Sequence, residues 1–184
     1  MSTQLDKVQP KNKIQLEQLI DYAFKHNIYD LNLIDTSKIT NMSNLFANCE
    51  YDIDVSNWDV SNVTNMYNMF YCCKNFDCDL SNWNVSNVTD MYSMFIACEN
   101  FKGKGLENWD VSNVKDIGST FAGCENFNCD LSNWDMSNVT DMSYVFIDCE
   151  KFKGKGLENW NVSNVTSMRR MFDGCNKLTI PDWY

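Results

Sequence analysis

A chain of 184 residues is long enough for one domain with a sizeable core and short for two. Its apolar fraction of 44% and aromatic fraction of 14% exclude a disordered chain. Because the formal net charge is −10 and no stretch reaches the roughly 18 consecutive apolar residues of a membrane-spanning helix, we expect neither direct nucleic-acid binding nor membrane insertion.

The N-terminal region, residues 1–30, is predicted to form a capping helix over the repeats that follow. The segment "NKIQLEQLIDYAFKHN" places six apolar residues on one helical stripe: Ile14, Leu16, Leu19, Ile20, Ala23 and Phe24. Asn12, with Gln15 three residues later, resembles a capping box at the start of this helix. The opening "MSTQLDKVQPKNK" has no apolar secretory segment, which predicts a cytoplasmic location by default.

Residues 31–176 contain a repeat of 24–26 residues. Tryptophan recurs every 25 or 26 residues, at Trp58, Trp83, Trp109, Trp134 and Trp160. Cysteine recurs every 24 to 26 residues, at Cys49, Cys73, Cys98, Cys124, Cys149 and Cys175. A fixed period in this range is typical of a solenoid, here of about six repeats. Residues 177–184 are predicted to form a C-terminal cap.

Two apolar periodicities alternate within each repeat. Leu80, Trp83 and Val85 follow the pattern of a short strand entered by a turn. The next segment has the spacing of a helical stripe, at Val88, Met91, Met94, Phe95 and Cys98. The sequence therefore predicts an α/β repeat solenoid, with parallel strands on one face and short helical segments on the other.

The loops that return from one repeat to the next are of two types. The segment "FKGKGLENW" occurs identically at residues 101–109 and 152–160, and the other type, with "CDLSNW", occurs at residues 78–83 and 129–134. The identical segments place lysines on an otherwise acidic chain, at Lys102, Lys104, Lys153 and Lys155. These lysines either attract an acidic partner or are simply solvated.

The pattern L-x-x-W-x-V at Leu80, Trp83 and Val85 resembles the L-x-x-L-x-L strand of leucine-rich repeats. The segment "VTDMYSMFIACENF" is similar to the BspA-like branch of that superfamily, which is found in bacterial surface lipoproteins. This resemblance implies a right-handed solenoid with a strand-lined face. It also implies a non-enzymatic protein that binds other proteins, sometimes host proteins, at the cell surface or after secretion.

Nine cysteines and one histidine leave three interpretations of the thiols open. The cluster Cys72, Cys73 and Cys78 suggests a disulfide or a metal site, but zinc needs four close ligands and His26 lies in the predicted cap. Buried free thiols that pack as small apolar groups explain the single repeat phase better. Cys78 and Cys129, in the return loops, are predicted to be the more exposed and reactive pair.

The repeated tryptophans and the "NVT" tripeptides each have two interpretations. The tryptophan column is either a carbohydrate-binding stack or, as its phase between Leu and Val favours, part of the core with each indole N–H bonded to a neighbouring repeat. The tripeptides, at Asn62, Asn87, Asn138 and Asn164, match a glycosylation sequon but are favoured as turn asparagines.

Two surfaces are candidates for binding. The first is the outward side of the predicted strands, with the candidate residues Asp59, Asn84, Asp110, Asp135 and Asn161. The second is the helical side, where specificity would come from residues that vary between repeats: Tyr67, Tyr92, Tyr144, Arg169 and Arg170. A solvated face without a partner is the alternative for the first surface.

These observations support three hypotheses about function. The first is a non-enzymatic scaffold that binds an unidentified protein partner, because no nucleophile, base and orienting group stand out together and no cofactor is indicated. The second is a structural module whose copies associate through the ends of the solenoid, where Trp183 and Tyr184 lie. The third is a thiol-based redox or metal-binding protein.

Overall fold

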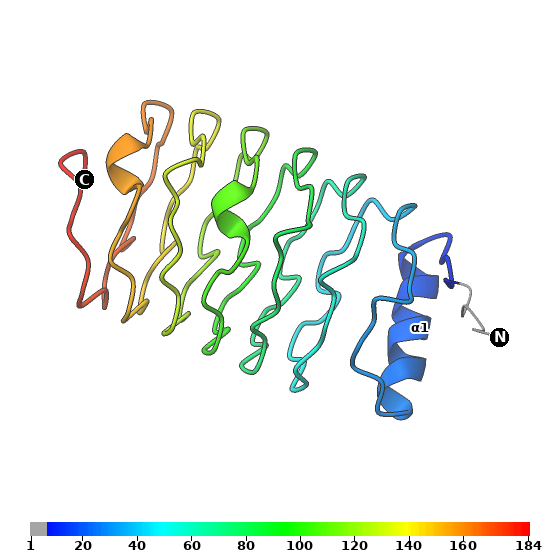
Figure 1. Cartoon of the computed structure of the whole chain (residues 1–184). Coiled ribbons are helices and arrows are strands. Elements are labelled where there is room, and N and C mark those ends of the chain that lie inside the picture. The colour runs from blue at the N-terminus through cyan, green and yellow to red at the C-terminus, as the bar shows by residue number, and fades with distance from the viewer. Residues whose placement is uncertain (1–6) are drawn as a thin grey trace.

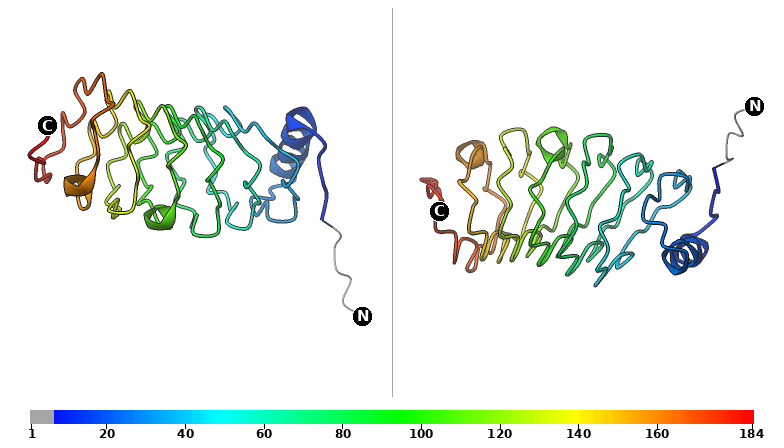
Figure 2. Two further views of the ribbon diagram at one scale, coloured as in Figure 1. Left: turned by 90° about the horizontal axis from the view of Figure 1, so that it is seen from above. Right: turned by 60° about the horizontal axis from the view of Figure 1, so that its bottom comes forward.

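The computed structural model describes residues 7–184, which form an elongated stack of similar coils with one helix at its N-terminal end (Figure 1). The α-helix α1 spans Lys13–Lys25, and two short 3-10 helices, η1 and η2, span Leu106–Asn108 and Leu157–Asn159. Turns and loops make up the coils between them. Figure 2 shows the coils lying side by side in sequence order from α1 to the C-terminus.

The predicted α/β leucine-rich-repeat solenoid is wrong. Across residues 7–184, neighbouring coils meet at isolated parallel bridges of single residues, and no strand or sheet forms. One column of these bridges follows the stack from Asn41 to Ser167, through Asn65, Asp90, Asp116 and Asp141. The predicted helical segments of the repeats are also absent, since α1 is the single α-helix of the described chain.

Left-handed residues prevent the helical segments from forming. Ser93 and Ala97 have φ angles of 57° and 54°, and an α-helix cannot continue through such residues. Backbone N–H groups therefore alternate between two kinds of acceptor. Met94 N–H donates to the Met91 carbonyl within its own coil at 3.1 Å, whereas Phe95 N–H donates to the Thr120 carbonyl of the next coil at 2.9 Å. Tight turns thus give the inward spacing that the sequence suggested for a helix.

Asparagine and aspartate side chains fold the predicted strands into turns as well. The Asn84 side-chain oxygen accepts the Ser86 backbone N–H at 3.1 Å, and the Trp83 N–H donates to the Leu80 carbonyl at 3.1 Å. Such local bonds compete with a strand ladder. As a result, residues 80–85 form no parallel bridge with a neighbouring coil.

The inward-facing residues predicted from the sequence do form the core. Trp83 is 4% exposed, Val85 is 1% exposed, and Val88 and Met91 are fully buried. Phenylalanine rings stack from coil to coil, as between Phe95 and Phe121 at 5.8 Å and 5°. The two inward stripes were therefore identified correctly, although the backbone that carries them was not.

Side chains of each coil reach back to carbonyl groups of the preceding coil. The Trp83 indole N–H donates to the Val55 carbonyl at 3.0 Å, which confirms the core interpretation of the tryptophans. The Cys98 thiol donates to the Phe70 carbonyl at 3.0 Å, and the Asn87 amide donates to the Ser61 carbonyl at 2.7 Å. In the part of the chain that is described, no buried side-chain nitrogen or oxygen lacks a partner.

Helix α1 covers the first coil, as predicted. Asn12 caps its N-terminus by accepting the Gln15 N–H at 3.0 Å, and Leu16, Ile20 and Ala23 are buried against the core. Ile14, which the predicted stripe included, is 66% exposed and therefore lies on the opposite side. Residues 1–6 of the predicted capping region lie outside the described residues.

The last coil has an open end. The N–H groups of Tyr144 and Phe146 donate to the next coil, but the equivalent groups in the last coil have no acceptor within residues 7–184. These groups belong to Met168, Arg170, Phe172 and Gly174. Trp183 stacks on Trp160 at 6.3 Å and covers part of this end.

Candidate functional site

The first candidate surface consists of Asp59, Asn84, Asp110, Asp135 and Asn161, and we call it the polar face. Its residues are turn residues. Each uses its side-chain oxygen to accept the backbone N–H two residues later, as Asp59 does from Ser61 at 3.0 Å and Asp110 from Ser112 at 3.1 Å. Asn84, Asp135 and Asn161 make the same bond to Ser86, Ser137 and Ser163. All five side chains are exposed in a regular column. Their structural role accounts for their repetition.

The second candidate surface, which carries Tyr67, Tyr92, Tyr144, Arg169 and Arg170 and which we call the tyrosine side, contains three separate contacts. Tyr67 and Tyr92 stack at 5.6 Å and are 37% and 38% exposed. The Arg169 guanidinium carbon lies 5.7 Å from the centre of the Tyr144 ring, and Arg170 pairs with Asp173 at 2.7 Å.

A half-buried column of acids lies along the bridges that join the coils. Burial raises the pKa of Asp116, and the neighbouring carboxylates of Asp141 and Asp90 raise it further. Between residues 7 and 184, no group of three or more His, Cys, Asp or Glu side chains is arranged to hold a metal ion.

All nine cysteines are free thiols. Burial raises the pKa of Cys98, Cys124 and Cys149 well above the ordinary thiol value. The prediction that Cys78 and Cys129 are exposed and reactive is wrong, because Cys129 is 7% exposed and burial raises the pKa of both thiols to about 12. Reactive cysteines have lowered pKa values instead.

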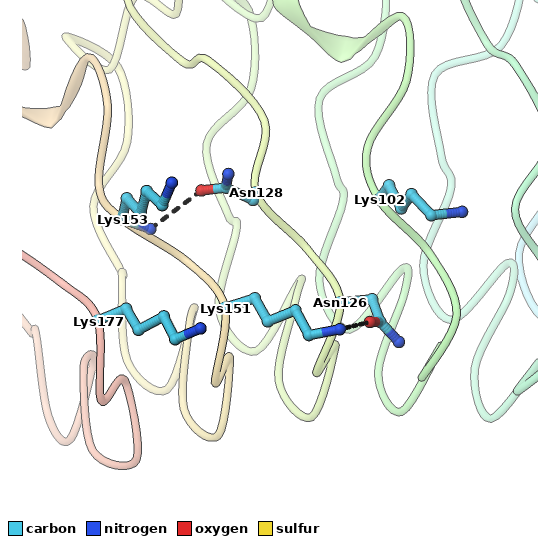
Figure 3. A pocket seen from close by; sticks show the side chains of 6 residues that line it. All are labelled: Lys102, Asn126, Asn128, Lys151, Lys153 and Lys177. Carbon is cyan, nitrogen blue, oxygen red and sulfur yellow. Dashed lines mark hydrogen bonds between the residues drawn. The ribbon is translucent and has the colours of Figure 1, made fainter.

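A groove lined by four lysines and two asparagines crosses the return loops toward the C-terminal end (Figure 3). It has a volume of about 450 Å³, and we call it the lysine groove. Its lining residues are Lys102, Asn126, Asn128, Lys151, Lys153 and Lys177. These residues come from four successive coils.

The repeat register brings the groove residues together. Asn126, Lys151 and Lys177 each lie two residues after a core cysteine, so they form one column across three coils. Lys102, Asn128 and Lys153 form the neighbouring column. Backbone bonds between coils fix this register: Lys151 N–H donates to the Glu125 carbonyl at 3.2 Å.

Four lysines of the return loops pair with an acid on a neighbouring coil. Lys104 pairs with Asp79 at 2.6 Å, and Lys155 pairs with Asp130 at 2.6 Å. The hydrogen bonds from these lysines, followed by those from Ser81 and Ser132, lower the pKa of each aspartate to about 2. Lys102 pairs with Asp77, and Lys74 pairs with Glu99.

Three groove lysines lack such an acid. In the described chain, no carboxylate lies within ion-pair distance of Lys151, Lys153 or Lys177. The Lys151 ammonium donates to the Asn126 side-chain oxygen. Asn128 lies on the coil before Lys153, and its side-chain oxygen accepts the Lys153 backbone N–H at 3.1 Å. The groove therefore concentrates positive charge on a protein whose net charge is −10.

The sequence identified part of this groove. Of the four lysines in the identical loops, Lys102 and Lys153 line the groove, whereas Lys104 and Lys155 pair with aspartates outside it. The spacing did not single out Lys151 and Lys177, which lie outside the shared segment. Their shared position, two residues after the repeat cysteine, is the signal in the sequence that places both lysines in one column.

Comparison with known proteins identifies one family. The chain matches the family described as "Mycoplasma protein of unknown function, DUF285" over residues 14–105 and again over residues 96–183. A search of curated proteins gives no match, and a search of solved structures gives none either. Helices long and apolar enough to cross a membrane are absent from residues 7–184. Since the two matched segments together span most of its length, the chain belongs to the DUF285 family.

Proposed function

We propose that this protein is a non-enzymatic scaffold that binds another protein, and that the lysine groove is its docking place. The observation that carries the proposal is the contrast among the return-loop lysines. Neighbouring lysines have a carboxylate partner on the preceding coil, whereas Lys151, Lys153 and Lys177 have none among the described residues. Lysines without an internal partner are available to a charged group from outside.

The coil stack is suited to hold such a site. The core residues of successive coils form one continuous apolar cluster, and backbone bonds such as Asn128 N–H to the Lys102 carbonyl at 3.4 Å fix the loops. A site on a rigid scaffold keeps its binding groups in place before the partner arrives.

The resemblance to BspA-like proteins also favours protein binding, although the leucine-rich architecture that it implied is wrong. By this resemblance, the partner is a host or cell-surface protein and the chain is located at the surface. A partner in the cytoplasm is the alternative. The tyrosine side is a secondary contact surface in this proposal, because Tyr67 and Tyr92 present exposed aromatic area.

Photo-crosslinking tests the proposed function. A photo-reactive residue replaces Asn128 in the groove, and a matched protein carries it at Asn84 on the polar face. We expect the Asn128 position to crosslink one defined protein in lysate. Protein without the photo-reactive residue should compete for this partner and reduce the crosslinked product. The variant Lys151→Gln/Lys153→Gln/Lys177→Gln should not reduce it. No product, or equal products at both positions, contradicts the proposal.

The open C-terminal end favours a second candidate function, association of copies of this chain. Val162, Val165 and Met168 pack against the core but are only partly buried there, and four backbone N–H groups of the last coil have no acceptor within residues 7–184. Light scattering over a range of concentrations tests this candidate. The mass should rise with concentration, and Val165→Lys should abolish the rise whereas Thr166→Lys should not. A constant monomer mass rules this function out.

A further inference from the structure

We infer that the lysine groove binds a short, extended, acidic segment of a protein, whose Asp or Glu carboxylates lie between lysines of adjacent coils; this inference rests on the proposed function. The geometry of the groove, the pairing of the surrounding lysines and the charge of the rest of the surface each restrict the class of ligand.

The groove presents hydrogen-bond donors and few acceptors. Lys151, Lys153 and Lys177 supply ammonium groups, and the oxygen of Asn128 already accepts the Lys153 backbone N–H at 3.1 Å. The Asn128 amide nitrogen is thus left as a further donor. Figure 3 shows the side chains of Lys151 and Lys177 running in the same direction along neighbouring coils. A set of donors with few free acceptors fits a ligand that carries acceptors and negative charge.

The extent of the groove fits an extended chain better than a single small anion. Its residues come from four successive coils, which at about 4.8 Å between neighbours span roughly 15 Å. An extended segment of about five residues covers that length at roughly 3.3 Å per residue. Lys102, at one end, pairs with Asp77 on the preceding coil, so the four ammonium groups do not converge on one point.

The surrounding surface disfavours a long polyanion. The whole chain carries a net charge of −10, and the exposed acids Glu125 and Glu150 directly precede Asn126 and Lys151 in sequence. A nucleic acid that extends beyond the groove meets this acidic surface at every further phosphate. A short protein segment can keep its carboxylates inside the groove. The chemistry of the site therefore favours an acidic peptide over DNA or RNA.

Binding of a defined peptide to the full chain tests the inference. The probe is a labelled peptide in which four glutamates alternate with glycines, measured by fluorescence anisotropy at low salt. We expect saturable binding that weakens with salt. A peptide with glutamine in place of glutamate should not bind. Inorganic phosphate and a labelled oligothymidylate of similar length serve as competing anions, and neither should bind as tightly as the glutamate peptide.

Two variants with the same loss of charge separate the groove from general attraction. Lys151→Gln/Lys153→Gln/Lys177→Gln removes the unpaired groove lysines, and Lys74→Gln/Lys104→Gln/Lys155→Gln removes three paired lysines elsewhere. We expect at least about tenfold weaker binding by the first variant and less than about twofold by the second. Circular dichroism checks that both variants are folded.

Several outcomes overturn the inference. Equal weakening in the two variants means general electrostatic attraction, and tighter binding of oligothymidylate or phosphate assigns the groove to another anion. If Asn128 crosslinks a protein but the glutamate peptide does not bind, the acidic-segment inference fails and the proposed function stands. If the peptide binds the groove but Asn128 crosslinks no protein, the proposed function fails instead.

Discussion

Residues 101–109 and 152–160 have the same sequence and nearly the same structure, but their first lysines have different surroundings. Both segments contain a 3-10 helix and a glycine with φ near 95°. The Trp109 indole N–H donates to the Leu80 carbonyl at 3.3 Å, and the Trp160 indole N–H donates to the Leu131 carbonyl at 3.2 Å. The difference lies on the preceding coil. The Lys102 backbone N–H donates to the carboxylate of Asp77, whereas the Lys153 backbone N–H donates to the uncharged amide oxygen of Asn128. In a coil stack, the neighbouring coil decides whether a surface lysine is neutralised.

The largest expected effect tests the shared part of this comparison. A Cβ atom on Gly105 would overlap the Ser81 backbone nitrogen, and one on Gly156 would overlap that of Ser132. Because backbone cannot move aside easily and φ is positive, Gly105→Ala and Gly156→Ala should each lower the free energy of unfolding by roughly 3–5 kcal/mol. Urea unfolding measures both losses. A difference of more than about 1 kcal/mol between the two would show that the copies are not equivalent in packing.

A smaller effect concerns the residue that distinguishes the copies. Asn128→Asp gives Lys153 the carboxylate that Lys102 already has, and should weaken binding of the glutamate peptide about tenfold. Asp77→Asn releases Lys102 into the groove and should strengthen that binding by about two- to threefold.

Asp79→Asn is the control for this pair of changes, since it releases Lys104, which does not line the groove. Peptide affinity should stay unchanged in this variant. Shifts of the same sign from Asn128→Asp and Asp77→Asn would contradict the comparison.

The equivalent lysines should also differ in their effect on stability. Lys102→Gln removes an exposed ion pair and should cost at most about 1 kcal/mol in the free energy of unfolding. Lys153→Gln removes no ion pair and reduces repulsion from Lys151 and Lys177, so its effect should be zero or slightly stabilising. Parallel urea titrations of the two variants give the comparison. A larger loss of unfolding free energy from Lys153→Gln than from Lys102→Gln would contradict this prediction.

The smallest effect is a pH dependence that both copies share. The folded pKa of about 2 for Asp79 and Asp130 lies below the ordinary value of about 3.9. As the pH falls, these two carboxylates therefore bind protons in the unfolded chain before they do so in the folded chain. The stabilisation by the two carboxylates is complete above about pH 4 and is lost as the pH falls through about 2.

Unfolding of the double variant Asp79→Asn/Asp130→Asn checks this dependence. The wild-type protein should be more stable than the variant at about pH 5, and the difference should shrink toward about pH 2. A difference that is constant over this range would mean that the lysine pairs do not lower these pKa values.

The sequence predicted which side chains face inward but not the backbone that carries them. Burial of Trp83, Val85 and Met91 follows from apolar spacing alone. The same spacing arises from a helix or from consecutive turns, and the left-handed φ of Ser93 and Ala97 decides for turns. Neither residue type signals that conformation strongly, because serine and alanine are not typical left-handed residues.

The candidate site was only partly predictable for a different reason. The unpaired character of Lys153 depends on Asn128, 25 residues earlier, and becomes visible only when adjacent coils are aligned. The polar column of Asp59, Asn84 and Asp110 looked like a binding face because its outward direction was predicted correctly. The bond that each side-chain oxygen accepts from the backbone N–H two residues later could not be read from an outward position alone.

The bonds that reach back from each coil give the stack a direction with consequences for how such chains vary in length. Trp58 donates its indole N–H to the Leu31 carbonyl, so deleting the first coil would leave a buried donor without an acceptor. A coil added after the last one would instead bring its own donors to carbonyls that are already in place, such as those of Ser163 and Phe172. Gain and loss of repeats among relatives should therefore concentrate at the C-terminal end.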